Sequence, residues 1–201
     1  MAAKHIIAYF LEDAGQEAII PPLVKRLIRE AGKPTENFEH HPLNARGGRS
    51  ISSYKEFLAD AKRNNHLPAD LLVVGSDGNC KGFATRRDEI NAVAANPPYP
   101  TVVTAVPDPH VERWYLLDPS ALSKAAGISK MPALPAHKCE KDYYKQLLRS
   151  AFNNSSIIPL LGGTEYGPLV AAEMDLYAAS KADHGFAEFI DGVKSWLKQL
   201  P

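Results

Sequence analysis

Residues 5–11 read HIIAYFL, and two further apolar runs follow along the chain, DLLVVG at residues 70–75 and TVVTAV at residues 101–106. Just after these runs lie three acidic residues, Glu12, Asp77 and Glu112. If the runs are neighbouring strands of one parallel sheet, the acids lie beyond the carboxyl ends of the strands, where open α/β sheets form their binding crevice. We therefore expect these carboxylates, which are distant in sequence, to converge on one site.

The segments between the apolar runs have helical patterns. Helices are expected at residues 15–32, 52–65 and 84–95, and a more polar second strand is expected at residues 37–43. Pro21 and Pro22 predict that the first helix either starts or breaks at that point. The resulting β-α-β-α-β-α-β order predicts a Rossmann-like α/β fold, with a parallel sheet of about four strands and helices on both faces.

Beyond residue 107 this alternation ends. Helical patterns return at residues 110–117, 142–152 and 188–200, and a proline-bearing loop is expected at residues 128–138. We see no internal repeat, low-complexity tract or linker that would separate two domains. Residues 1–201 are therefore expected to form a single domain, with an α/β core at 1–107 and a mainly helical C-terminal part at 108–201.

Composition restricts the function classes. The chain has 201 residues, and its 23 Lys plus Arg equal its 23 Asp plus Glu. The chain as a whole therefore lacks the excess positive charge that is typical of nucleic-acid-binding proteins, although a local positive patch is compatible with this total. Cys80 and Cys139 are too few for a disulfide framework and match no zinc pattern, which favours a reducing compartment. The apolar N-terminal stretch is too short to span a bilayer and lacks a signal-peptide cleavage site. We expect a cytoplasmic protein that does not bind membranes.

Four blocks of the sequence resemble a known family. They are LEDAGQEAIIPPLVKRLI, VVGSDGNCKG, ERWYLLDPSAL and YGPLVAAEMDL, in this order. The chain is similar to the small Toprim-like proteins of bacteria and phages, including the Toprim domain of overcoming-lysogenization-defect nucleases and stand-alone relatives found beside ATPases in phage-defence loci. The resemblance covers nearly the whole chain. It implies a Toprim-like fold, Mg²⁺- or Mn²⁺-dependent hydrolysis of DNA or RNA, a role in antiviral defence with an ATPase partner, and a possible homo-oligomer.

The resemblance also assigns roles to individual residues. Glu12 matches the Toprim glutamate, which binds metal or handles protons, and Glu17 matches a second acidic position at the start of the first helix. Asp77 matches the second aspartate of the Toprim Asp-x-Asp motif. Gly75 replaces the first aspartate, so the site has fewer negative charges, which puts two-metal hydrolysis in doubt and leaves single-metal catalysis open. Asn79 still offers a neutral carbonyl oxygen to a metal or a bound water.

Elementary chemistry agrees in kind with this assignment. Phosphodiester hydrolysis needs a metal to polarise the phosphoryl oxygen and to ready a water molecule, and hard carboxylate ligands select Mg²⁺ or Mn²⁺. Glu12 and Asp77 are the expected ligands, Glu112 completes the shell or acts as the base, and Lys81 is the nearest candidate cation. Nucleic-acid contacts are expected from four arginines, Arg46, Arg49, Arg86 and Arg87.

Structural roles are open alternatives for the same residues. Each of the three acids could be a turn former or helix cap, and Glu112 could simply pair with Arg113 or with a helix terminus. Lys81, Arg86 and Arg87 could form a solvated helix face. Asp118 is expected to be a cap or turn residue, Cys80 a small buried hydrophobe, and GGTEYG at residues 162–167 a turn rather than a phosphate loop.

Two further function classes fit the sequence. One is a non-catalytic Toprim-like sensor or scaffold subunit of an ATPase complex, which the loss of an acid at Gly75 would permit. The other is a receiver-like phosphoacceptor, in which Glu12 and Asp13 hold Mg²⁺, Asp77 takes the phosphoryl group and Thr104 is the switch hydroxyl. The receiver hypothesis fits the strand ends, but the chain length and the ERWYLLDP block argue against it.

Overall fold

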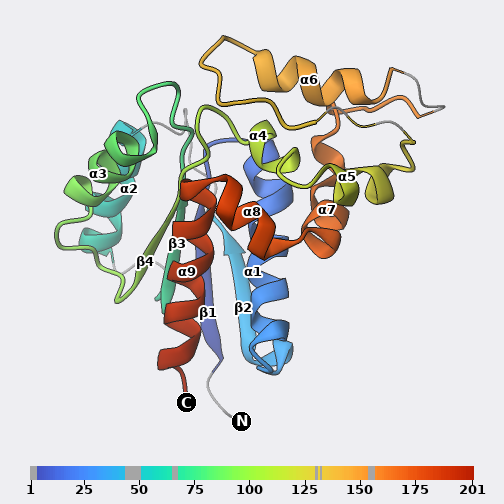
Figure 1. Ribbon diagram of the computed structural model, residues 1–201. Coiled ribbons are helices and arrows are strands. Elements are labelled where there is room, and N and C mark those ends of the chain that lie inside the picture. The colour runs from blue at the N-terminus through green and yellow to red at the C-terminus, as the bar shows by residue number, and fades with distance from the viewer. Residues whose placement is uncertain (1–3, 44–50, 65–67, 130, 132, 154–156) are drawn as a thin grey trace.

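The computed structural model describes residues 4–43, 51–64, 68–129, 131, 133–153 and 157–201 (Figure 1). Within this part of the chain, four strands form one parallel sheet in the order β2-β1-β3-β4, so β1 and β3 are central. The strands are β1 (His5–Phe10), β2 (Phe38–Pro42), β3 (Leu71–Gly75) and β4 (Val102–Ala105). The predicted α/β fold with a four-stranded parallel sheet is confirmed.

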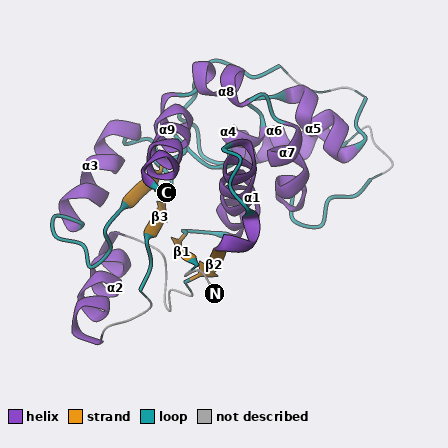
Figure 2. Cartoon of the chain, turned by 90° about the horizontal axis from the view of Figure 1, so that it is seen from below, coloured by secondary structure: helices purple, strands orange, loops and turns teal. Residues whose placement is uncertain are grey.

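Helices cover both faces of the sheet (Figure 1, Figure 2). One face carries α1 (Ala14–Glu30) and α9 (His184–Gln199), and the other carries α2 (Ile51–Asn64) and α3 (Phe83–Val93). The side chains of β1 alternate between two apolar cores: Ile7 and Tyr9 belong to the core beneath α1 and α9, and Ala8 and Phe10 belong to the core beneath α2. This is the pattern of a strand that is buried on both faces.

The described residues after 107 form short helices beside and above the sheet (Figure 1). They are α4 (Glu112–Tyr115), α5 (Pro119–Ala126), α6 (Tyr143–Ala151), α7 (Gly167–Glu173) and α8 (Leu176–Ala182), with a 3-10 turn at η2 (Thr164–Tyr166). A further 3-10 turn, η1 (Thr35–Asn37), lies between α1 and β2. Trp114 of α4 is fully buried against Phe186 and Phe189 of α9, so one apolar core joins this part to the sheet. Among the described helices, none is long and apolar enough to cross a bilayer.

Sequence patterns predict α4, α6 and α9 but not α5, α7 and α8. The latter three have eight, seven and seven residues, which is about two turns, so they carry little periodic signal. A capping residue marks two of them: the Asp118 carboxylate accepts hydrogen bonds from the backbone of Ser120 and Ala121 at the start of α5, and Asp175 caps α8. The cap role predicted for Asp118 is confirmed.

Helix α1 runs without interruption through Pro21 and Pro22, so the prediction that it starts or breaks there was wrong. Pro22 has no backbone N–H to donate to the carbonyl oxygen of Ala18. Gly167, the first residue of α7, packs against that carbonyl: a Cβ atom at Gly167 would lie 2.5 Å from the Ala18 oxygen. Tertiary packing of α7 on α1 therefore covers the point at which proline weakens the helix.

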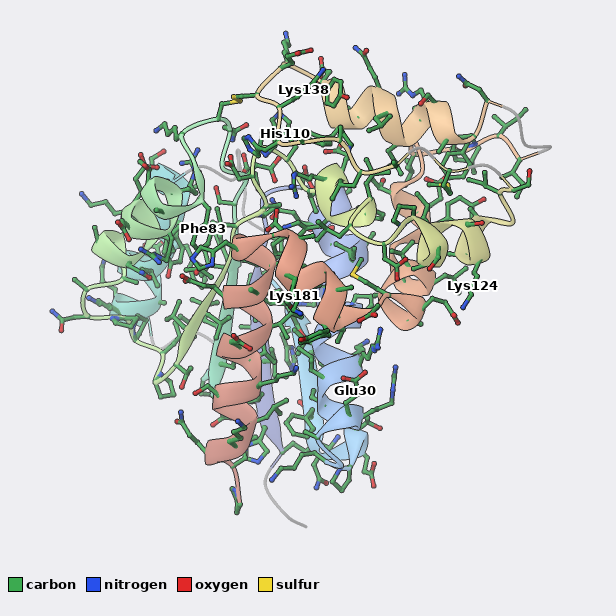
Figure 3. All side chains as sticks on the ribbon, in the orientation of Figure 1. Glu30, Phe83, His110, Lys124, Lys138 and Lys181 are labelled. Carbon is green, nitrogen blue, oxygen red and sulfur yellow. A yellow bond between two sulfur atoms is a disulfide. The ribbon has the colours of Figure 1, made fainter. Side chains whose placement is uncertain are left out.

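The two cysteines form a disulfide between Cys80, in the loop after β3, and Cys139, in the segment before α6. Cys80 is exposed, so the expectation that it is a small buried hydrophobe was wrong. Both partners lie on loops that no local pattern brings together. The bond ties the segment leading into α6 to the carboxyl end of the sheet, where the predicted site lies (Figure 3).

Candidate functional site

Glu12 and Asp77 meet at the carboxyl ends of the two central strands. Glu12 follows β1 and Asp77 follows β3, which pair in parallel up to Phe10 and Val74. The Oε2 atom of Glu12 accepts hydrogen bonds from the backbone N–H of Asp77, at 2.7 Å, and from the Ser76 hydroxyl, at 2.9 Å. The structure therefore brings together two of the acids that the strand ends predict.

Asp77 is 7 % exposed, and its carboxylate is bonded at both oxygens. Oδ1 accepts from the Gln16 side-chain amide at 2.9 Å, and Oδ2 lies 3.1 Å from Nδ1 of His110. Burial raises the pKa of Asp77 to about 6; the hydrogen bonds from His110 and Gln16 oppose this rise, and the nearby charges of Asp13 and Glu12 add to it. The hydrogen bond to Asp77 in turn raises the pKa of His110 above its usual value.

Gln16 links the two strand ends from within the core. Its side chain is fully buried; Oε1 accepts from the backbone N–H of Glu12 at 3.0 Å, and Nε2 donates to Asp77. Gly75 makes this possible, since a Cβ atom there would collide with Oε1 of Gln16 and lie 2.7 Å from the Leu11 side chain. Gly75, where the Toprim resemblance would expect an aspartate, is therefore the residue that leaves room for Gln16.

The loop after β3 is bonded to the loop after β4. The N–H of Gly78 donates to the carbonyl of Pro107 at 2.7 Å, and the N–H of Asn79 donates to the carbonyl of Pro109 at 2.9 Å. Asn79 has φ 47°, in the left-handed region, and its side-chain amide donates to the Asp77 carbonyl at 3.3 Å. The predicted metal-ligand role of Asn79 thus competes with a local role, in which its amide closes the loop around Asp77.

The predicted cations lie in internal ion pairs beside the loop. Lys81 and Arg86 both bind Glu89, at 2.9 and 2.8 Å. The Arg86 side chain is 11 % exposed and also donates to the Asp77 carbonyl, so it supports the loop and offers little surface to a nucleic acid. Arg87 pairs at 3.0 Å with a glutamate of α9. Lys81 is 53 % exposed and fits the solvated alternative, whereas Arg86 is buried and does not.

Glu17 and Glu112 line different pockets. Glu17 lies in the first turn of α1 and lines a pocket of about 320 Å³ with Lys25 and His40. Glu112 is buried on α4 and lines a pocket that includes Asp13. The structure therefore separates these two acids from the Glu12–Asp77 pair.

Two of the four predicted nucleic-acid-binding arginines, Arg46 and Arg49, lie outside the described residues.

Sequence reasoning missed Gln16 and His110. Gln16 is not ionisable and gives no chemical signal, although it lies in the first block of the Toprim resemblance. His110 follows β4, and only the order of the strands places the loop after β4 beside Asp77. Figure 3 shows His110 at the carboxyl end of the sheet, near the segment that carries Lys138.

The side chains at the carboxyl end of the sheet fit a metal site in which few of the ligands come from the protein. Within the described part of the chain, no group of three or more His, Cys, Asp or Glu side chains could hold a metal ion. Glu12 and Asp77 are two carboxylates, and Mg²⁺ is often held by one or two carboxylates while waters and substrate phosphates complete its shell. Among the described contacts, Oε1 of Glu12 accepts no hydrogen bond. The pair therefore suits an ion shared with a substrate, but not an ion enclosed by protein.

The fold and the carboxyl end of the sheet define a class of protein. It is an α/β protein with two acidic residues, Glu12 and Asp77, beyond the central strands of a parallel sheet. Comparison with protein-family models, curated proteins and solved structures found no match. What such a site does must therefore be argued from its own chemistry.

Gly75→Ala places a methyl group against Gln16 and Leu11, so we expect it to lower the free energy of unfolding by about 1–3 kcal/mol. Gln16→Ala removes one of the two obstructing groups, so Gly75→Ala should cost less in that background. Urea denaturation of the wild type, the two single variants and the double variant measures the coupling. Strictly additive effects would contradict the close packing of Gln16 on residue 75.

Asp77→Asn should stabilise the metal-free protein at pH 8 and leave its stability unchanged at pH 4. The folded-state pKa of Asp77 is raised to about 6 from 3.8, so the folded state binds this proton more tightly, and ionisation costs stability as the pH rises through that interval. A shift of this size corresponds to about 3 kcal/mol at high pH, as an order of magnitude.

Asparagine can keep both bonds, since its oxygen accepts from Gln16 and its amide donates to neutral His110. Thermal or urea unfolding at both pH values, with a chelator present, measures the difference. An equal effect of Asp77→Asn at pH 4 and pH 8 would show that the charge of Asp77 is not the cause.

Proposed function

We propose that this chain is a Toprim-like, metal-dependent nuclease that hydrolyses phosphodiester bonds of DNA or RNA. The observation that carries the proposal is the meeting of Glu12 and Asp77 at the carboxyl ends of β1 and β3, where the backbone N–H of Asp77 donates to the Glu12 carboxylate at 2.7 Å. A carboxylate pair at this edge is suited to Mg²⁺ or Mn²⁺. The order of the Toprim-like sequence blocks is independent support.

In this proposal Glu12 and Asp77 hold the metal ion, which when bound polarises the phosphoryl oxygen and lowers the pKa of a water molecule. Gln16 orients both acids through its buried amide. His110 is 24 % exposed, and its hydrogen bond to Asp77 raises its pKa, which favours the protonated imidazole. It would give that proton to the leaving oxygen as a general acid.

Exposed cations near this edge support a nucleic-acid substrate. The segment before α6 and α6 itself carry Lys138, Lys141, Lys145 and Arg149, all exposed. Helix α6 lies at the end of the sheet where β1 and β3 terminate (Figure 1). The zero net charge of the whole chain therefore conceals a local group of cations, which is what phosphate contacts need.

A non-catalytic scaffold subunit for an ATPase is the second candidate. It is favoured by the glycine at position 75 and by the small number of acids at the edge. The receiver-like hypothesis is weaker, because the chain length and the ERWYLLDP block argue against it.

The same proposal includes a cytoplasmic location and a role in phage defence. It also includes an ATPase partner and assembly into a homo-oligomer. In the cytoplasm, the exposed Cys80–Cys139 bond would meet thiol-reducing systems.

Glu12→Gln should abolish Mg²⁺- or Mn²⁺-dependent cleavage, with a loss of about 100-fold or more, because it removes charge that the transition state requires. The assay uses plasmid, single-stranded DNA and tRNA, with and without chelator, for the chain alone and with the ATPase encoded beside it. Mn²⁺ binding, followed by electron paramagnetic resonance, should weaken in the same variant. Glu30→Gln, at the far end of α1, is the matched control and should cleave normally.

Cleavage that persists in Glu12→Gln would refute the assignment of the site. A stable complex with the ATPase and no cleavage of any substrate, with or without ATP, would favour the scaffold instead.

A further inference from the structure

The pocket that Glu112 lines lies beside Asp13, the residue that follows Glu12. It has a volume of about 260 Å³ and lies between the start of α1, the buried helix α4 and the exposed helix α6. Its lining includes Asp13, Gly15, Glu112, Lys145, Arg149 and Leu161. Asp13 follows Glu12 directly and acts on the pKa of Asp77, so the pocket lies within electrostatic range of the proposed site. Its volume is just below the range of pockets for drug-sized molecules, which suits one nucleoside unit rather than an oligonucleotide.

Glu112 supplies a buried carboxylate to this pocket. The residue is 6 % exposed, and among the described residues its ion-pair partner is Lys145, at 3.9 Å. The Lys145 side chain is itself 59 % exposed, so this contact is long and partly screened. A carboxylate buried to this extent needs hydrogen-bond donors. Glu112 therefore has acceptor capacity that a ligand in the pocket can meet.

Lys145 and Arg149 supply the opposite charge. They are four residues apart on α6, so they project from the same side of the helix into the same pocket. Both side chains are exposed, and a Cβ atom on Gly162 would lie 3.8 Å from the Arg149 guanidinium. A lysine and an arginine in this arrangement suit a phosphate group.

The glycine loop beside the pocket does not bind phosphate through its own amides. The carboxylate of Glu165 accepts hydrogen bonds from the backbone N–H groups of Leu160, Leu161 and Gly163. An internal carboxylate thus occupies the donors that a phosphate loop would offer, and the turn predicted for this segment is confirmed. Phosphate in this pocket must instead be bound by the cations of α6.

We propose that the pocket binds one nucleotide of the substrate next to the cleaved bond, with its phosphate on Lys145 and Arg149 and a guanine base on Glu112. Guanine presents two parallel N–H donors, N1–H and N2–H, which match the two oxygens of a carboxylate. Adenine and cytosine offer one amino donor each, and uracil offers one ring N–H between two carbonyls, which a carboxylate repels. Leu161, which is 64 % exposed, gives the base an apolar wall.

This inference rests on the proposed function for its substrate class, but its test does not need activity. The probes are the 5′-monophosphates of guanosine, inosine, adenosine, cytidine and uridine, titrated calorimetrically into the full chain. We expect the guanosine nucleotide to bind at least about 10-fold more tightly than the uridine nucleotide, since a bidentate base contact contributes about 1–3 kcal/mol of discrimination. The inosine nucleotide lacks the 2-amino group and should bind more weakly than the guanosine nucleotide.

Two sets of variants separate the base contact from the phosphate contact. Glu112→Gln should remove most of the preference for guanosine while retaining binding of the phosphate. The double variant Lys145→Ala, Arg149→Ala lies on an exposed helix face, and it should weaken all five nucleotides by a similar factor. Glu173→Gln, an exposed position on α7, is the control and should bind like the wild type.

Equal affinity for all five nucleotides, binding of inorganic phosphate alone, or no binding would overturn the inference. If Glu112→Gln fails to fold, equal binding of the guanosine and inosine nucleotides by the wild type would overturn it. The two proposals can be refuted separately. Selective binding of guanosine monophosphate without any cleavage would support the nucleotide pocket and refute the nuclease function. Cleavage that requires Glu12, without nucleotide selectivity, would support the nuclease function and refute the nucleotide pocket.

Discussion

The organisation of the carboxyl edge depends on the close approach of Gln16 to Gly75. A side chain at position 75 would occupy the space of the Gln16 amide, which is fully buried and joins Glu12, beyond β1, to Asp77, beyond β3. The amide offers an acceptor to the backbone of Glu12 and a donor to Asp77, so it satisfies groups that burial would otherwise leave costly. The two acids are held together by a neutral group rather than separated by a third negative charge.

The position of His110 and Glu112 is fixed from the opposite end of the chain. Arg113, on the same short helix as Glu112, forms an ion pair at 2.7 Å with Asp183, and both side chains are less than a tenth exposed. Asp183 also caps α9 by accepting from the N–H of Phe186. Burial raises the pKa of Asp183, and Arg113 opposes that rise. The last helix of the chain therefore anchors the short segment that faces Asp77.

The segment before α6 closes over this edge through long-range contacts. Cys139 is bonded to Cys80, and His137 lies 3.1 Å from the carboxylate of Asp108. Both contacts join this segment to loops that follow β3 and β4, so α6 and its cations are held near the carboxylate pair. The proposed nucleotide pocket depends on this arrangement, because α6 supplies Lys145 and Arg149 to its lining.

The sequence alone indicated the strands and placed an acid just beyond the first and third of them, because apolar periodicity and the position of an acid after a strand are local properties. The β-α-β order predicted a parallel sheet, and the pairing of β1 with β3 then brings Glu12 and Asp77 together. It also indicated the cap at Asp118 and the turn at residues 162–167. Tertiary structure alone decided the rest: that α1 continues through two prolines, that Glu112 enters a neighbouring pocket, and that Gln16 and His110 reach Asp77. These outcomes depend on side chains from separate elements that fill the same buried space. A local sequence pattern does not show which distant residues will pack against it.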